Sequence, residues 1–125
     1  MDNMSEIDHS IMRMYIAVLS DVPDHMVPTL VAHTMLWASD ELAQDPNYQA
    51  WKQHSFRKCV VRLSQREWSK LLMRLQEANT PHTLGHENKT LNGAKSCCIP
   101  APFAPSDVPN VLKSAKLWTP TNYED

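Results

Sequence analysis

The sequence predicts a single α/β domain whose four-stranded mixed sheet is flanked by helices, and three observations favour this class. Segments typical of strands and of helices alternate along the chain, which is the order found in sheets that helices cover. The first strand candidate is a continuous apolar run, as expected for a strand buried on both faces. The length of 125 residues suits one domain, and 42% hydrophobic and 21% charged residues are ordinary for a globular protein.

The amino-terminal part of the chain is predicted to hold one strand and two helices. Residues 12–19 form the apolar strand, and a turn containing Asp and Pro ends it. A helix is expected from residue 24 or 25 to residue 42, because apolar side chains recur there at helical spacing. Pro28 falls in its first turn, where a missing N–H costs little. Asp45 followed by Pro46 predicts the cap and first residue of a short helix that continues through residue 51.

The middle of the chain is predicted to hold a second strand followed by the most clearly marked helix. In residues 56–63, apolar side chains alternate with basic ones, which is typical of a strand. Ser64 and Glu67 have the spacing of a capping box, in which each side chain accepts a hydrogen bond from the other residue's backbone N–H. The helix that they begin is expected to continue to about Asn79, with a stripe of Trp and Leu side chains facing the core.

Two short strands and a proline-rich segment are predicted in the remainder. Pro81 ends the helix, and residues 82–84 and 96–99 are the third and fourth strands, with a sharp turn at Asn92-Gly93 between them. Prolines recur from residue 100 onward, so only a short helix is expected, near residues 108–114. The predicted layout is an amino-terminal extension (1–11), the α/β domain (12–118) and a carboxy-terminal tail (119–125).

Hydropathy and cysteine content narrow the class of protein. No apolar run approaches the roughly 18 residues that a membrane helix requires, and the acidic start of the chain does not resemble a secretory signal. The three cysteines are Cys59, Cys97 and Cys98, and an odd count with two neighbours favours free thiols over disulfides. We therefore expect a cytoplasmic protein without membrane association.

Charge is distributed unevenly along the chain, although the net charge is only −2. Residues 1–50 hold eight acidic residues and one basic residue, whereas residues 51–74 hold seven basic residues and one acidic residue. This asymmetry predicts either an electrostatic contact within the protein or a local contact with an anionic partner.

The basic block includes a stripe of cations on the third helix. Arg66, Lys70 and Arg74 follow one another at a spacing of four residues and therefore share one helix face. A solvated polar face is the simpler interpretation of this stripe. The functional interpretation is a track for RNA phosphates, which three cations of the preceding strand would extend. Those three cations are Arg57, Lys58 and Arg62.

Four residues are candidates for a site at one end of the sheet. Asp21 follows the first strand, where α/β sheets place functional groups, although a turn or capping role is the simpler interpretation. Glu87 and Ser96 stand at the ends of the third and fourth strands and are predicted to approach Asp21 across the sheet edge. His33, in the middle of the first helix, is expected to be a hydrogen-bonded structural histidine.

Neither a metal nor a cofactor is expected. His82 and His86 could readily share one ion only on a helix, and Pro81 argues against a helix here. Cys97 and Cys98 would point to opposite faces of a strand, so buried small side chains are the simpler role for both. With two glycines in total, the sequence contains no glycine-rich phosphate loop.

Several segments follow one another as they do in a known family. The shared segments are an apolar strand with a loop aspartate (15–21), a helix histidine (31–33), an acidic loop (86–88), a strand that runs into proline (96–102) and a closing segment (108–117). The second strand and the capped helix also fall where that family has them. Over about residues 12–118, the sequence therefore resembles the type 2 peptidyl-tRNA hydrolase family in the order and type of its features.

The resemblance implies the fold of that family and its activity, which is hydrolysis of the ester between a peptide and the 3′ ribose of tRNA. Such chemistry requires a base or carboxylate that activates water and donors that stabilise the oxyanion. By resemblance, Asp21, Glu87 and Ser96 are the catalytic candidates and His33 supports them. The basic residues would hold the tRNA backbone, and no cofactor is implied.

Two other functions are compatible with the sequence. The family's early-helix lysine falls at about Val27, and the glutamine before its histidine falls at about Leu30. A hydrocarbon cannot replace an ammonium group that stabilises charge, so one alternative is an inactive module that binds an RNA end, a nucleotide or a protein. Another is an interaction protein built on a homodimer, with tryptophans and methionines as anchors. Binding of tRNA without turnover would separate the inactive module from the hydrolase.

Overall fold

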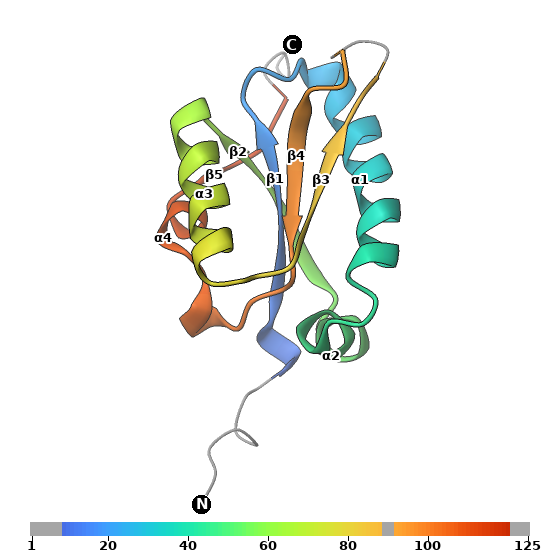
Figure 1. The fold of residues 1–125 in the computed structure, drawn as a ribbon, viewed down its shortest axis with the longest axis vertical. Coiled ribbons are helices and arrows are strands. Elements are labelled where there is room, and N and C mark those ends of the chain that lie inside the picture. Colours follow the sequence, from blue (N-terminus) through green and yellow to red (C-terminus); the bar gives the residue numbers. More distant parts are fainter. Residues whose placement is uncertain (1–8, 89–91, 121–125) are drawn as a thin grey trace, which may run out of the picture.

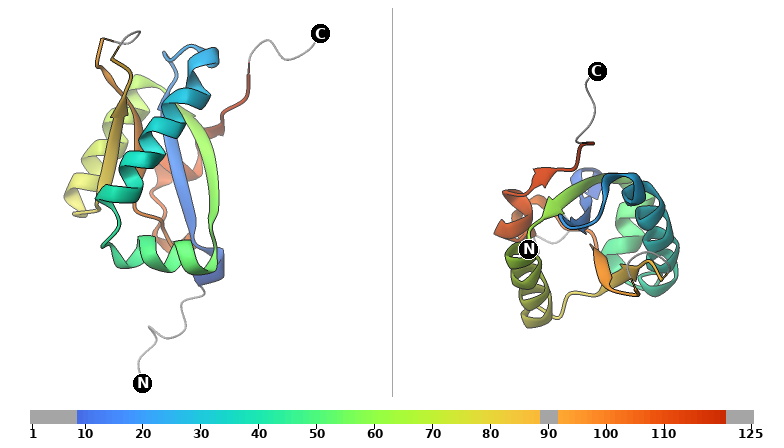
Figure 2. Two further views of the ribbon diagram at one scale, coloured as in Figure 1. Left: turned by 90° about the vertical axis from the view of Figure 1, so that its right-hand side faces the viewer. Right: turned by 90° about the horizontal axis from the view of Figure 1, so that it is seen from above.

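The computed structural model describes residues 9–88 and 92–120 and shows a three-layer α/β arrangement. A five-stranded mixed sheet forms the middle layer, with α1 and α2 on one side and α3 and α4 on the other (Figures 1 and 2). The strands are β1 (Arg13–Leu19), β2 (Arg57–Leu63), β3 (His82–His86), β4 (Lys95–Pro100) and β5 (Lys116–Leu117). The α-helices are α1 (Val27–Glu41), α2 (Pro46–His54), α3 (Gln65–Glu77) and α4 (Asn110–Lys113), and the 3-10 helices are η2 (His9–Ile11), η3 (Asp24–Met26) and η4 (Pro105–Asp107).

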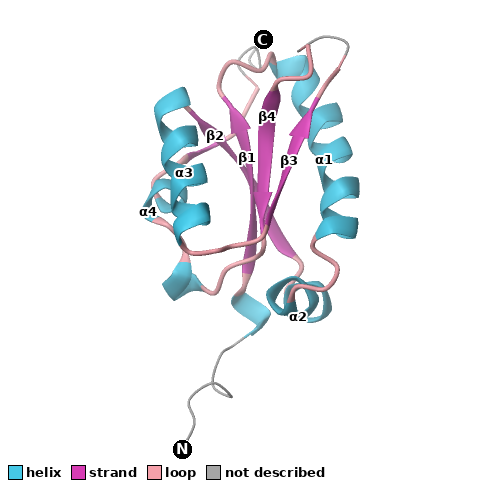
Figure 3. Ribbon diagram, viewed as in Figure 1, coloured by secondary structure: helices cyan, strands magenta, loops and turns pink. Residues whose placement is uncertain are grey.

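The strand order is β3-β4-β1-β2-β5, so β1 lies at the centre of the sheet (Figure 3). β1 pairs in parallel with β2 and antiparallel with β4, and β3 pairs antiparallel with β4. β1, β2 and β3 therefore all run in the same direction. Their carboxyl ends meet at one end of the sheet, which is also where β4 begins (Figure 1).

The predicted α/β class is confirmed, but the predicted strand count of four is wrong. β5 pairs antiparallel with β2, with Leu117 opposite Val61 and Lys116 opposite Arg62. The Trp118 N–H extends this pairing by donating to the Val60 carbonyl at 2.9 Å. Both residues of β5 are exposed, so the strand has no buried face and no alternating pattern from which it could be predicted.

The local signals that predicted strands and helices correspond to observed contacts. Every residue of β1 except Arg13 is buried, as expected for a strand covered on both faces. The Ser64–Glu67 capping box is formed in both directions and begins α3. The Asp45 side chain accepts a hydrogen bond from the Tyr48 N–H at 3.0 Å and begins α2, which is three residues longer than predicted.

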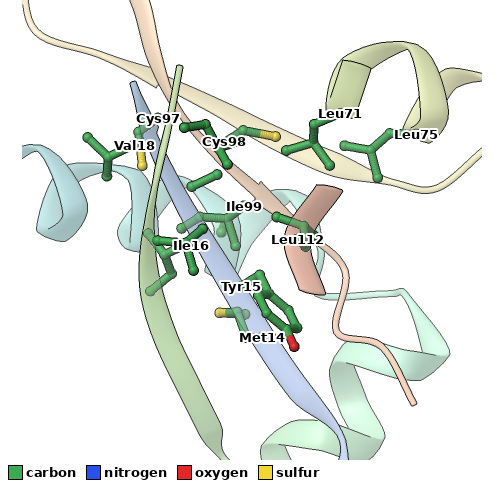
Figure 4. Packing of buried hydrophobic residues seen from close by; sticks show 14 of the residues in the cluster. Met14, Tyr15, Ile16, Val18, Leu71, Leu75, Cys97, Cys98, Ile99 and Leu112 are labelled. Atoms are coloured by element: carbon green, nitrogen blue, oxygen red, sulfur yellow. The ribbon is translucent and has the colours of Figure 1, made fainter. Parts of the chain in front are cut away.

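Side chains from the sheet and from both helix layers form the core. Strand pleating directs Tyr15 and Cys98 toward α3 and Leu112, whereas Cys97 lies on the opposite face of β4 (Figure 4). Cys97 and Cys98 are both fully buried, and all three cysteines are free thiols. No helix in the described part of the chain is long and apolar enough to cross a membrane.

A very close contact between α1 and β3 fixes the position of this helix against the edge of the sheet. A Cβ atom added to Gly85 would lie 1.9 Å from Thr34 Oγ1, so only glycine permits this contact. The Thr34 hydroxyl in turn donates to the Leu30 carbonyl at 2.7 Å, which keeps it inside the helix contour. The pairing of β3 with β4 is irregular immediately after Gly85, between Gly85 and His86. This contact determines where the residues that follow β3 are placed.

Candidate functional site

The common end of β1, β2 and β3 carries most of the polar side chains predicted to form a site. Asp21 follows β1, Glu87 follows β3, and Ser96 is the second residue of β4. β4 separates β3 from β1, so the ends of those two strands lie about 10 Å apart, which is two strand spacings. Sequence order alone thus predicted the correct end of the sheet for all three residues.

Asp21 is exposed in the loop after β1 and borders a hollow of about 630 Å³. The Ser20 N–H donates to the Leu63 carbonyl at 2.7 Å, and the buried Val22 side chain anchors the other side of the loop. Gln65 Nε2 donates to Asp21 Oδ2 at 3.4 Å, which links the loop to the start of α3. The loop is therefore anchored on both sides of Asp21, whose carboxylate faces solvent.

The hollow beside Asp21 also contains an ion pair. Arg62 Nη2 donates to Asp24 Oδ1 at 2.6 Å, and both side chains are roughly three-quarters buried. Arg62 Nη1 also donates to the Ser20 carbonyl at 3.4 Å. His25 and Trp118 complete the polar lining of the hollow. Arg62 thus already has an acidic partner, which reduces its value as an RNA-binding cation.

Trp118, which lines the same hollow, also carries a buried donor without a partner among the described residues. Its indole Nε1 is buried and has no hydrogen-bond partner in the described part of the chain. Buried polar groups without a partner are uncommon in folded proteins, and each requires an explanation such as a ligand or a water molecule. Sequence reasoning missed Trp118 because its position depends on β5, which was not predicted.

Glu87 faces α1 and contacts the predicted supporting histidine. Glu87 Oε2 lies 3.5 Å from His33 Nε2, and the His33 side chain is 46% exposed. His33 is therefore a surface residue of the site rather than a histidine enclosed in the core. The two groups form an ion pair when the imidazole is protonated.

An aromatic stack adjoins the Glu87–His33 pair. The Trp37 and His86 rings stack at 5.1 Å with an interplanar angle of 21°, and His33 lies 6.2 Å from Trp37. Regular alternation after Gly85 would turn His86 toward α3, so the irregularity in β3 allows it to face α1. Sequence reasoning considered the His86 side chain as a metal ligand and assigned no site role to Trp37.

Ser96 is the predicted site residue that the fold separates from the others. It is only 4% exposed, and its hydroxyl donates to the Ala94 carbonyl at 3.2 Å. It alternates with Cys97, which faces α1, so Ser96 points into the α3 layer. Direct contact between Ser96 and a substrate is not compatible with this burial.

The six predicted RNA-binding cations do not form one surface. Arg66, Lys70 and Arg74 are all exposed on α3. On β2, pleating sends Lys58 and Arg62 to the α1 side of the sheet and Arg57 to the α3 side. Lys58 Nζ lies 3.6 Å from the centre of the Phe56 ring, at the end of the sheet far from Asp21. Lys58 and Arg62 thus lie on the face of the sheet opposite the α3 stripe, and only Arg57 shares its side.

The positions that correspond to the family's lysine and glutamine are part of the core. Val27 and Leu30 are each 1% exposed. They direct no polar group toward Asp21, and the lysine that the resemblance would place there has no counterpart at either position.

Metal-ligating residues do not converge in the part of the chain that the structure describes. His82 and His86 occupy the two ends of β3, and four residues of strand span about 13 Å. That separation is too large for both rings to bind one ion.

Comparison with known proteins gives no family for this chain. No protein-family model matches the sequence, and no curated protein sequence matches it.

Proposed function

We propose that this protein is a diverged peptidyl-tRNA hydrolase-like protein that receives the 3′ end of a tRNA at the end of the sheet beside Asp21. The observation that carries the proposal is the position of Asp21. Its exposed carboxylate borders a hollow with polar walls, and Gln65 links it to the first turn of α3. The cationic stripe on α3 begins at the next residue, Arg66. A backbone-binding surface and a candidate base are thus adjacent.

The charge of the α3 stripe supports a polyanionic partner. Arg66, Lys70 and Arg74 span about 12 Å along the helix, at 1.5 Å per residue. Within residues 9–88 and 92–120, two ion pairs are found, His33–Glu87 and Arg62–Asp24, and neither includes a cation of the stripe. The acidic first half of the chain therefore does not neutralise the stripe there. Uncompensated cations along one face suit the phosphates of an RNA strand.

The proposed reaction uses Asp21 to activate water. The carboxylate accepts a proton from a water molecule, which attacks the ester carbonyl carbon and forms a tetrahedral oxyanion. Collapse of this intermediate breaks the bond to the ribose oxygen, which takes up a proton and leaves as the tRNA 3′ hydroxyl. Arg62, which lines the hollow, is the candidate donor for stabilising the oxyanion. Glu87, with His33, borders the substrate from the α1 side.

Replacing Asp21 with asparagine should abolish most hydrolysis of N-acylated aminoacyl-tRNA. The amide cannot accept the proton of the attacking water, so we expect a rate reduction of at least about 100-fold. Stability should change little, because Asp21 is exposed and its contact with Gln65 is long. Release of free tRNA measures the activity, and thermal unfolding checks the fold. Asp40→Asn is the matched control, since Asp40 is exposed in α1 away from this hollow. Full activity of Asp21→Asn would restrict Asp21 to its role in the turn.

The second candidate function is RNA binding without catalysis. Val27 and Leu30 are apolar and buried, so the cation that the family uses in this region is missing from those positions. An esterase that lacks this charge loses transition-state stabilisation but keeps its binding surface. Saturable tRNA binding with no release of the acyl group would favour this function over hydrolysis.

Binding of tRNA is expected to depend steeply on salt. If the three cations of the α3 stripe each displace a counterion, affinity should fall roughly 20- to 40-fold between 50 and 200 mM salt. Arg66→Glu combined with Lys70→Glu should weaken binding at least about tenfold and flatten this dependence. Lys52→Glu combined with Lys116→Glu changes the net charge equally, but on α2 and β5. Equal losses in both double variants, measured by filter binding, would assign the effect to overall charge.

A further inference from the structure

A second, smaller hollow lies at the opposite end of the sheet from Asp21, where β1 and β2 begin. Its volume is about 230 Å³, and three cationic side chains line it: Arg13, Arg57 and Lys113. The rest of its lining is apolar or aromatic and consists of Ile11, Tyr15, Phe103, Pro105 and Val108. Among the described residues, no acidic side chain lines this hollow.

The three cations have no acidic partner in the described part of the chain. Arg13 and Arg57 are directly paired residues of parallel strands, so their side chains leave the same face of the sheet about 5 Å apart. Like charges in this arrangement repel each other. Neither arginine nor Lys113 takes part in an ion pair among the described residues. Asp107, the nearby acid of η4, lines a different hollow with Arg74. The arrangement therefore concentrates positive charge without compensating it.

Backbone hydrogen bonds and aromatic packing hold the walls of this hollow in place, although its three cations are exposed. The Arg13 N–H donates to the Phe103 carbonyl at 3.0 Å, and the Phe103 N–H donates to the Arg13 carbonyl at the same distance. Phe103 and Tyr15 are 7% and 8% exposed, and their rings meet edge to face at 6.4 Å. Apolar walls lower the local dielectric constant and strengthen the attraction between the cations and an anion.

We infer that this hollow binds a phosphate group, which Arg13, Arg57 and Lys113 hold together. Guanidinium groups match the geometry of phosphate oxygens, and a dianion would remove the repulsion between the two arginines. A volume of about 230 Å³ is below the roughly 300–1,000 Å³ of pockets that enclose whole small molecules, so the hollow suits a phosphate group rather than an entire nucleotide. The inference is independent of the proposed function, because Asp21 lies at the other end of the sheet.

Calorimetric titration tests this inference on the full chain. Inorganic phosphate and ribose 5-phosphate, at constant ionic strength, represent a free anion and a phosphate monoester. We expect saturable binding of at least one of them by the unmodified protein. Binding should weaken at least about tenfold in Arg57→Gln and in Arg13→Gln. Lys116→Gln removes an exposed cation on β5, outside the hollow, and should bind as the unmodified protein does. Tighter binding of ribose 5-phosphate would identify a monoester as the ligand, and tighter binding of inorganic phosphate would identify the free anion.

Thermal unfolding gives a second, independent readout. Without phosphate, Arg57→Gln should be at least as stable as the unmodified protein, because the substitution removes the repulsion from Arg13. With phosphate, the unmodified protein should gain unfolding temperature and Arg57→Gln should not. Equal gains in both proteins, or the same gain from sodium chloride at equal ionic strength, would overturn the inference. Absence of binding to both phosphate compounds would overturn it as well, and would leave the tRNA experiments unaffected.

Discussion

Gly85→Ala is expected to lower the free energy of unfolding by about 3 kcal/mol or more, or to prevent folding altogether. The added Cβ would stand 1.9 Å from Thr34 Oγ1 and 2.8 Å from Thr34 Cβ and Cγ2. The helix and the strand would have to move apart to accept it. Urea unfolding at equilibrium measures the loss. The same shift would move Glu87 away from His33, because His33 belongs to α1 and Glu87 directly follows β3.

Two further variants make the Gly85 prediction specific. Gly93→Ala is the matched control: its Cβ would meet only Asn88 Oδ1, at 3.4 Å, and its positive φ of 73° should cost about 1 kcal/mol. Thr34→Ala removes the hydroxyl and Cγ2 but keeps the Cβ, so it should rescue Gly85→Ala in part. A double-mutant cycle measures this coupling. A Gly85→Ala protein no less stable than Gly93→Ala would contradict the close contact.

Alkaline pH is expected to destabilise the protein because two buried thiols ionise less readily in the folded state than in the unfolded chain. Burial raises the pKa of Cys97 from 9.0 to about 11, against a smaller opposing effect of its hydrogen bond with Thr34. Burial raises the pKa of Cys98 further, and its proximity to Cys97 adds to this. In the unfolded chain both thiols ionise near their ordinary pKa of 9.0. Above that pH, the unfolded state loses protons that the folded state keeps, so stability falls as pH rises.

The size of the alkaline effect follows from about 1.4 kcal/mol per pH unit for each thiol. The unfolded thiols are only half ionised at pH 9, and folded Cys97 begins to ionise near pH 11, so between these two pH values the two thiols together should cost about 4 kcal/mol. Their contribution to the slope should disappear only below about pH 8, one unit under the unfolded pKa. Urea unfolding under reducing conditions, repeated across this pH range, measures the dependence.

A variant with both cysteines replaced by alanine separates the thiols from other titrating groups. Its stability should depend less on pH above 9, although the lost packing lowers stability at every pH. Tyr48, whose pKa burial raises above 10.0, remains in both proteins and cancels in the comparison. Cys59→Ala is the control, because Cys59 is only half-buried. Parallel pH profiles for the double variant and the unmodified protein would show that the buried thiols do not control alkaline stability.

Local sequence signals predicted most of the fold, whereas pairing between distant segments determined the rest. The apolar run of β1 and the Ser64–Glu67 capping box act within a few residues, so the sequence shows them directly. β5 forms because the outer edge of β2 offers unpaired backbone groups, and its own two residues carry no signal. Because β5 was not predicted, Trp118 was not recognised as a residue that lines the hollow beside Asp21.

The candidate site shows the same division between local and distant information. The order of strands and helices was enough to place Asp21 and Glu87 at one end of the sheet. The contact between Glu87 and His33 depends on the strand order, which brings β3 beneath α1. The burial of Ser96 follows from the position of β4 inside the sheet, where both faces are covered. The separation of Arg57 from Arg62 follows from strand alternation and was in principle predictable. Helical periodicity, by contrast, placed the α3 cations on one exposed face correctly.

β5 also has a consequence for solubility that its length of two residues does not suggest. A long flat strand with open backbone groups is a template on which another chain can add a strand and aggregate. By occupying the groups of β2 at Val61 and Arg62, β5 removes the middle of that template. Lys116 is exposed on β5, the new edge strand, and its charge disfavours the addition of a strand from another chain. The short carboxy-terminal strand therefore protects the molecule against unwanted self-assembly.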